Sequence, residues 1–125
     1  MNNYFSGLAY NMSAMKKAQT INDEVIHRMA RRIARRFRPE HIILFGSRAR
    51  GDARPDSDVD FLVVMPVKSK REKQLEIRLA LHQGFATVPV DVIVVTPQEY
   101  ETYARIPGTI VRPAVRDGKV LYVRR

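Results

Sequence analysis

Hydrophobic and polar positions form alternating blocks along the chain, and each block predicts an element. Four short apolar runs, rich in Ile, Val, Leu or Phe and bounded by turn residues, predict strands near residues 42–45, 61–65, 90–95 and 119–123. Between them lie stretches with helical spacing or helix-capping signals, and these predict the helices. The alternation of helices and strands predicts an α/β domain, with helices packed on a small mixed β-sheet.

The first helix is predicted between Asn22, a good N-cap, and Pro39. Its apolar positions fall on one helical stripe, which we expect to be buried: Val25, Ile26, Met29, Ile33 and Phe37. We expect residues 1–20 to be a loosely ordered arm or a short docking helix, and residues 21–125 to form the single domain.

A second helix is predicted from the capping box Ser69–Glu72 to about Gln83, with Gly84 as its stop. On this helix we expect Leu75, Leu79 and His82 to form the inner face. A shorter helix is predicted over Pro97–Arg105, with Thr96 as N-cap, and one or two further helical turns over residues 109–116.

Charge and composition limit the partners and the location. The formal net charge is +9, which favours an anionic partner such as nucleotide phosphates, nucleic acid or an acidic protein. The polar side of the first helix concentrates this charge in Arg28, Arg31, Arg32, Arg35, Arg36 and Arg38. This face is either simply solvated or a docking site for RNA phosphates or an acidic partner. The chain has no cysteine and no apolar run that could span a membrane, and we expect a cytoplasmic protein.

The candidate chemistry lies between the first two strands. The strand ending at Phe45 is followed by Gly46 and Ser47, then by ten residues, then by Asp58-Val59-Asp60 at the start of the next strand. Because side chains alternate along a strand, Asp58 and Asp60 point to one face. Two adjacent carboxylates repel each other, so we expect a divalent cation there, and Mg²⁺ is the natural candidate for oxygen ligands and phosphates.

Further candidates flank this pair. Asp91 lies in the next predicted strand, in Val90-Asp91-Val92-Ile93-Val94-Val95, on one face with Ile93 and Val95. A helical turn over residues 47–50 would present backbone N–H groups and the Ser47 hydroxyl to a triphosphate. Arg48 and Arg50 are candidate phosphate ligands in the same turn, or else ordinary surface arginines.

The spacing of Gly46-Ser47 and Asp58-Val59-Asp60, with a third carboxylate at Asp91, resembles the nucleotidyltransferase superfamily of DNA polymerase β. Within it, the short chain resembles the minimal nucleotidyltransferases of prokaryotes, the MNT proteins. The resemblance implies a polymerase β-like domain in which Asp58, Asp60 and Asp91 are catalytic and hold two Mg²⁺ ions. Gly46, Ser47, Arg48 and Arg50 would bind the nucleotide, with ATP as substrate.

The MNT resemblance also implies a partner. Such proteins often act as antitoxins of a HEPN-domain RNase toxin, in a hetero-oligomer, and transfer AMP from ATP to a tyrosine hydroxyl of that toxin. We therefore expect a protein adenylyltransferase enzyme. Three alternatives stay open: an idle antitoxin that neutralises its partner by binding, a small-molecule nucleotidyltransferase of the aminoglycoside type, and a basic nucleic-acid binder.

Overall fold

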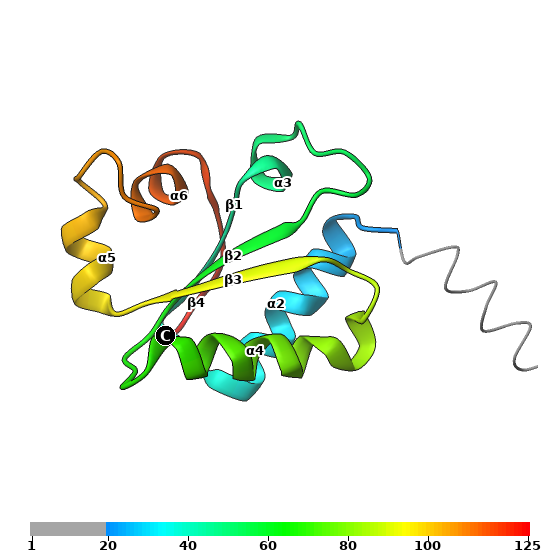
Figure 1. Cartoon of the computed structure of the whole chain (residues 1–125), viewed down its shortest axis with the longest axis horizontal. Helices are drawn as coiled ribbons and strands as arrows, with labels where there is room; N and C mark the ends of the chain where they lie inside the picture. The colour runs from blue at the N-terminus through cyan, green and yellow to red at the C-terminus, as the bar shows by residue number, and fades with distance from the viewer. Residues whose placement is uncertain (1–19) are drawn as a thin grey trace, which may run out of the picture.

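The computed structural model describes residues 20–125, which build a four-stranded mixed sheet with helices on both faces (Figure 1). The strands are β1 (His41–Phe45), β2 (Val59–Val64), β3 (Val90–Val95) and β4 (Lys119–Val123), in the spatial order β3-β2-β1-β4. β1 pairs antiparallel with β2 and β4, whereas β2 and β3 run parallel. The amino ends of β2 and β3 therefore meet the carboxyl end of β1 at one edge of the sheet.

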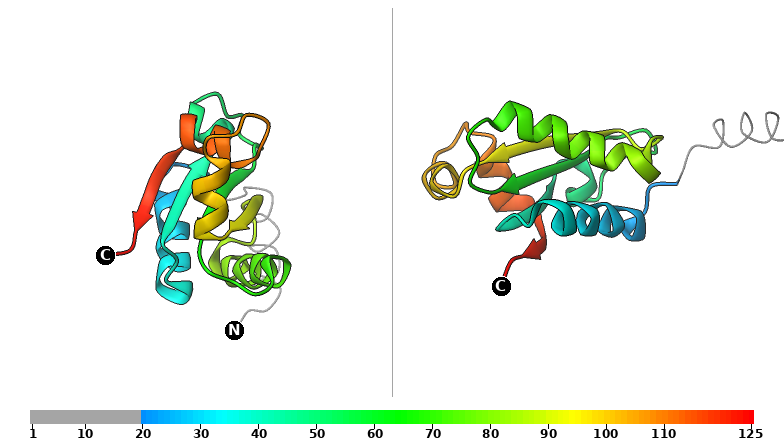
Figure 2. Two further views of the ribbon diagram at one scale, coloured as in Figure 1. Left: turned by 90° about the vertical axis from the view of Figure 1, so that its left-hand side faces the viewer. Right: turned by 90° about the horizontal axis from the view of Figure 1, so that it is seen from below.

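One face of the sheet, called here the closed face, is covered by two long helices, α2 (Asp23–Phe37) and α4 (Lys70–Phe85) (Figures 1 and 2). The side chain of Asn22 accepts a hydrogen bond from the N–H of Val25 at 2.9 Å, so the predicted N-cap is confirmed. The predicted stripe of α2 is buried apart from Phe37, which is partly buried. Every second residue of β1, β2 and β3 points into this core.

The prediction for the inner face of α4 is wrong. Leu75 and Leu79 are 54% and 60% exposed, and His82 is exposed too, while the helix buries Ile77, Ala80, Leu81 and Phe85. The rotation of the helix is set by its neighbour: the Gln74 side chain accepts a hydrogen bond from the N–H of Val94 in β3 at 2.9 Å. In this orientation the Ile77–Leu81 side lies against the sheet. The predicted stop is confirmed, because Gln83 and Gly84 have non-helical backbone angles.

The other face, called here the open face, is covered only in part, by α5 (Pro97–Tyr103) and α6 (Val111–Asp117). The capping box of Thr96 and Glu99, with both of its hydrogen bonds, begins α5. The apolar cluster here is smaller than that of the closed face and consists of Ile43, Phe45, Leu62, Val64, Val95, Val111 and Ala114. Short helix α3 (Ser47–Arg50) follows β1 directly at the edge where β2 and β3 begin.

The predicted mixed α/β architecture is confirmed, with strand and helix boundaries within two or three residues of expectation. The arm predicted for residues 1–20 falls, but for Thr20, outside the described residues. Across residues 20–125, no helix is long and apolar enough to cross a membrane.

Candidate active site

The carboxylates of Asp58, Asp60 and Asp91 gather at the amino ends of the two parallel strands. Asp60 and Asp91 are direct partners across β2 and β3. They lie on the open face, since each alternates with residues buried under α5 and α6, Leu62 after Asp60 and Ile93 after Asp91. Asp58 comes two residues before Asp60, in extended chain ahead of β2, and is exposed. The structure thus places Asp60 and Asp91 side by side on the open face, and Asp58 two residues before Asp60 at the same end of the sheet.

The backbone of Gly46 lies directly against the carboxylate of Asp60. Phe45 is the register partner of Asp60, and Gly46 follows it with φ 75° and ψ −159°, a backbone region that is essentially restricted to glycine. A Cβ added at Gly46 would overlap the Oδ2 atom of Asp60. The glycine therefore permits both the sharp turn and the close approach of the Asp60 carboxylate to the backbone.

The backbone after Gly46 turns at once into α3, as the sequence predicts. The carbonyl of Gly46 accepts from the N–H groups of Ala49 and Arg50, both at 3.1 Å, and Gly51 ends the turn with φ 88°. Ser47, partly exposed, is the first residue of this turn. Ser47 thus follows Gly46 directly, at the end of the sheet where Asp60 lies, and binding of phosphate by its hydroxyl stays a prediction.

The pKa of Asp60 is affected by the two neighbouring carboxylates. Partial burial, the largest cause, together with repulsion from Asp91 and Asp58, raises the pKa of the Asp60 carboxyl from 3.8 to about 6. The nearby guanidinium of Arg50 opposes this rise. Arg50 also forms an exposed ion pair with Asp52 at 3.4 Å. A carboxylate held at an energetic cost next to two others favours a bound cation.

The side chain of Asp91 has a partner that the sequence did not suggest. Its Oδ1 atom lies 3.3 Å from Nη2 of Arg78 on α4. No local pattern predicts this pair, because it depends on α4 lying beside β3. In the described part of the chain, no three acidic or histidine side chains converge closely enough to form a metal site. With Asp91 paired to Arg78, the carboxylates do not close around an ion by themselves.

Arg48 is used differently from the predicted phosphate ligand. Its guanidinium donates to the carbonyls of Arg54, Pro55 and Ser57 at 2.9–3.2 Å, and more weakly to that of Ile21 at 3.4 Å. It therefore fastens the loop that leads into Asp58 to the start of α2. Phosphate binding by Arg48 stays a prediction, and in this structure its hydrogen bonds go to the loop.

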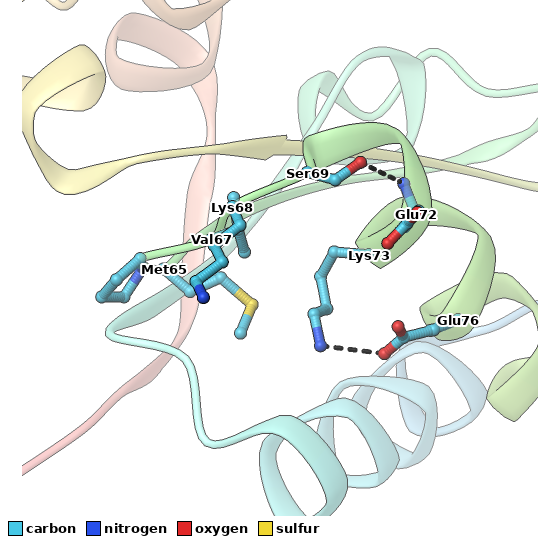
Figure 3. Close-up of a pocket in the computed structure, with 8 residues that line it drawn as sticks. Met65, Val67, Lys68, Ser69, Glu72, Lys73 and Glu76 are labelled. Carbon is cyan, nitrogen blue, oxygen red and sulfur yellow. Dashed lines mark hydrogen bonds and ion pairs between the residues drawn. The ribbon is translucent and has the colours of Figure 1, made fainter.

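A separate hollow of about 530 Å³ lies at the opposite end of β2, where the strand leads into α4 (Figure 3). Its lining includes Met65, Lys68, Ser69 and Lys73, and the ion pair of Lys73 with Glu76 at 2.8 Å crosses its wall. None of the predicted site residues lines it. This hollow therefore does not mark the candidate active site.

A mixed sheet that presents two aligned acidic strands beside a glycine–serine turn is typical of a class of protein: enzymes that act on phosphate groups. Comparison with known proteins makes this specific. Residues 26–115 match the family described as "Nucleotidyltransferase domain". The chain belongs to this family and is a nucleotidyltransferase enzyme, which confirms the resemblance found in the sequence.

Known proteins also show similarity in sequence and in fold. A Methanocaldococcus jannaschii protein named "Putative protein adenylyltransferase MJ0604" is 36% identical over 87 residues, covering 70% of this chain and 82% of that protein. Two solved structures share the fold, with TM-scores of 0.56 and 0.53 and identities of 20% and 23%; both cover 84% of this chain and 76% of the other. They are a mutant of the toxin–antitoxin MntA–HpeT and a toxin–antitoxin with AMP-PNP.

Proposed function

We propose that this nucleotidyltransferase transfers AMP from ATP to a hydroxyl group of a partner protein in the cytoplasm, and that the partner is a HEPN-type RNase toxin. The observation that carries the proposal is the alignment of Asp60 with Asp91 beside Gly46 and Ser47 on the open face. The archaeal relative named as a protein adenylyltransferase supports a protein acceptor. The toxin–antitoxin neighbours support an antitoxin role by their fold.

The donor set fits Mg²⁺, because carboxylates are hard oxygen ligands and Mg²⁺ completes its shell with substrate phosphates and water. Asp58 and Asp60 would hold the ion that accompanies the triphosphate, and Asp91 would add a second position once it leaves Arg78. The metal supplies charge neutralisation and lowers the pKa of the acceptor hydroxyl. The repulsion that raises the pKa of Asp60 would be relieved by such a cation.

The chain's own groups then have distinct tasks. The turn after Gly46 and the Ser47 hydroxyl hold the phosphates, and Arg50 adds positive charge at the same edge. The acceptor oxygen bonds to the α-phosphorus as the bond to the β-phosphate oxygen breaks, so pyrophosphate leaves. The hydroxyl proton passes to a carboxylate. Asp91 is the proposed acceptor of this proton, because it lies beside Asp60 at the amino end of β3.

The open face carries apolar side chains that suit a macromolecular partner. Tyr103, Ile106 and Ile110, on α5 and in the connection to α6, are 38%, 44% and 46% exposed. α5 and α6 lie on the same face of the sheet as the carboxylates, although α5 follows the carboxyl end of β3 and the carboxylates lie at its amino end. Exposed apolar side chains on this face favour a docked protein over a small acceptor.

The test is to purify the tagged protein from its host, add ATP and Mg²⁺, and measure the intact masses of the proteins that accompany it. We expect a partner to gain the mass of one or more adenylyl groups. The variant Asp58→Asn/Asp60→Asn should abolish the gain. Asp56→Asn/Glu101→Gln removes the same charge from two exposed acids that are not among the predicted site residues, and this variant should retain the gain.

A second function, neutralisation by binding alone, is favoured by one observation: Asp91 is paired with Arg78, and within residues 20–125 no three-ligand metal cluster is formed. It predicts that a partner binds the intact protein and Asp58→Asn/Asp60→Asn equally, with no mass gained by either. That result would overturn the transfer proposal while leaving the family membership intact.

A further inference from the structure

The arginines of α2 form a basic face on the side of the molecule away from the candidate active site. We call this set the basic face: Arg28, Arg31, Arg32, Arg35, Arg36 and Arg38. The apolar side of α2 packs on the closed face of the sheet, whereas the carboxylates lie on the open face. From Arg28 to Arg38 the row extends about 15 Å along the helix axis.

Part of the basic face surrounds a hollow of about 180 Å³, lined by Arg28, Arg31, Arg32, Arg35 and Phe85. Two guanidinium groups, those of Arg28 and Arg32, each lie 5.5 Å from the centre of the Phe85 ring. Arg32 is also held by the carbonyls of Ala80 and Gln83 at 3.0 and 2.6 Å. These contacts fix arginine side chains that would otherwise be flexible, so part of the ordering needed to bind a ligand is already present.

The positive charge of this face is not balanced within the described residues. None of the six guanidinium groups forms an ion pair in residues 20–125, where all the ion pairs involve other cations. All the cations around the hollow are arginines, whose planar forks match phosphate or carboxylate groups in a bidentate way. Like charges kept together on one helix face favour an anionic ligand.

The composition of the basic face itself distinguishes phosphates from an acidic protein. A protein interface needs apolar or aromatic anchors in its centre. None of the exposed large hydrophobic side chains of the described chain lies on α2, and Phe85 is only 4% exposed beneath its arginines. Binding to a nucleic-acid backbone needs no such anchor, since contacts to phosphates and release of counterions supply the affinity.

We propose that the basic face binds the phosphodiester backbone of a nucleic-acid strand, without reading its sequence. The site lies across the sheet from the carboxylates, so a bound strand leaves the candidate active site free. This inference does not depend on the proposed transfer reaction, because it uses different residues and a different face.

The test measures the binding of a short, labelled, mixed-sequence RNA strand by fluorescence anisotropy over a series of salt concentrations. The variant Arg28→Gln/Arg31→Gln/Arg35→Gln removes three exposed cations from the basic face. If each contacts one phosphate, the slope of log K against log salt becomes shallower by about 2, and the affinity at moderate salt falls at least about tenfold.

The matched control is Arg71→Gln/Arg105→Gln/Lys119→Gln, which removes three exposed cations spread over α4, the connection after α5, and β4. It should retain the wild-type slope, and so should Asp58→Asn/Asp60→Asn. A DNA strand of the same sequence identifies the source of the backbone, since tighter binding of RNA indicates contacts to its 2′-hydroxyl groups.

Two outcomes would overturn the proposal. Equal losses in the two triple variants, both with native circular dichroism, would mean that only the net charge of the protein attracts the strand. Competition by polyglutamate as strong as that by unlabelled RNA of equal charge would indicate an acidic protein ligand instead.

Discussion

The same strands contribute to both faces of the sheet, but one face holds the buried apolar core and the other holds the candidate active site. On the closed face, β1, β2 and β3 bury an apolar cluster under two long helices. On the open face, the cover of α5 and α6 leaves the edge of β2 and β3 with Asp60 and Asp91, both partly exposed. Side-chain alternation lets one strand serve both faces, because neighbours in sequence point in opposite directions.

Asp60 and Phe61 show the difference within a single step of the chain. Phe61 is completely buried on the closed face. Asp60, one residue earlier, is a carboxylate whose pKa is raised by burial and by its acidic neighbours. The comparison teaches that substitutions on the closed face should change stability, whereas those at the open edge should change activity, and can even stabilise the fold.

The largest expected change in stability comes from the closed face. Phe61→Ala should lower the free energy of unfolding by about 3–5 kcal/mol, because it leaves a cavity among buried neighbours. Urea unfolding followed by circular dichroism measures this loss. Leu79→Ala, at a position that is 60% exposed, is the control and should change stability by less than about 0.5 kcal/mol. If Phe61→Ala lost as little stability as the control, the closed face would not be a tightly packed core.

Gly46→Ala tests the open edge. The substitution forces a Cβ into a glycine-only backbone region, which costs about 1–3 kcal/mol. It also displaces the Asp60 carboxylate, so nucleotidyl transfer should fall at least about 100-fold, as for other misplaced catalytic groups. The readouts are the unfolding free energy and the rate of adenylyl transfer to the partner.

Gly51→Ala is the matched control for this experiment. Gly51 also has a positive φ of 88°, but a Cβ there meets no atom within 4 Å. It should therefore lose stability through backbone strain while keeping most of its transfer activity. Equal losses of activity in the two variants would mean that the approach of Gly46 to Asp60 is not what matters.

Asp60→Asn should stabilise the protein at neutral pH while abolishing transfer. The pKa of Asp60 is about 6 in the folded state against 3.8 ordinarily, so between these values the folded state binds more protons than the unfolded state. Wild-type stability therefore falls as pH rises through this window. The variant lacks this loss and should gain about 1–2 kcal/mol above pH ~7, and nothing below pH ~4, once solvent screening is allowed for.

Thermal unfolding of Asp60→Asn and wild type across this pH range checks the sign, with exposed Asp56→Asn as the control. Mg²⁺ should raise the melting temperature of the wild type but not of Asp60→Asn, because a ligand stabilises only the state that binds it. A destabilised Asp60→Asn above pH ~7 would show that this carboxylate is part of the structural framework.

The sequence was informative where a local pattern determines the structure. The strands, the cap of α2 at Asn22 and the turn after Gly46 all follow from neighbouring residues. The inner face of α4 could not be predicted, since Leu75/Leu79 and Ile77/Leu81 are equally plausible apolar pairs. Their choice depends on the contact of the helix with β3, which is formed only in the folded protein.

The same reason explains two arginine contacts that the sequence did not reveal. Arg48 binds the carbonyls of a loop whose course the sequence does not reveal. Arg78, 13 residues before Asp91, reaches it only because α4 lies along β3. Interactions between distant segments therefore mark the limit of prediction at this site.

Arg78→Gln should give the smallest change in the free energy of unfolding, and it tests the open edge alone. The Arg78–Asp91 pair is nearly half exposed on both sides, and exposed pairs contribute about 0.2–1 kcal/mol, so stability should fall by no more than about 0.5 kcal/mol. Releasing Asp91 leaves its negative charge unpaired at the open edge. Mg²⁺ should then bind about two to five times more tightly, as measured by calorimetry with a nonhydrolysable ATP analogue present.

Arg71→Gln, an equal charge change at an exposed position of the same helix, controls for the general effect of removing a cation. If both variants tighten Mg²⁺ binding equally, the pair with Asp91 has no special role. If only Arg78→Gln tightens Mg²⁺ binding, the ion pair with Arg78 keeps Asp91 from binding metal until metal and nucleotide displace the arginine. The open edge would then be completed by its substrate, in contrast to the closed face, which is complete on folding.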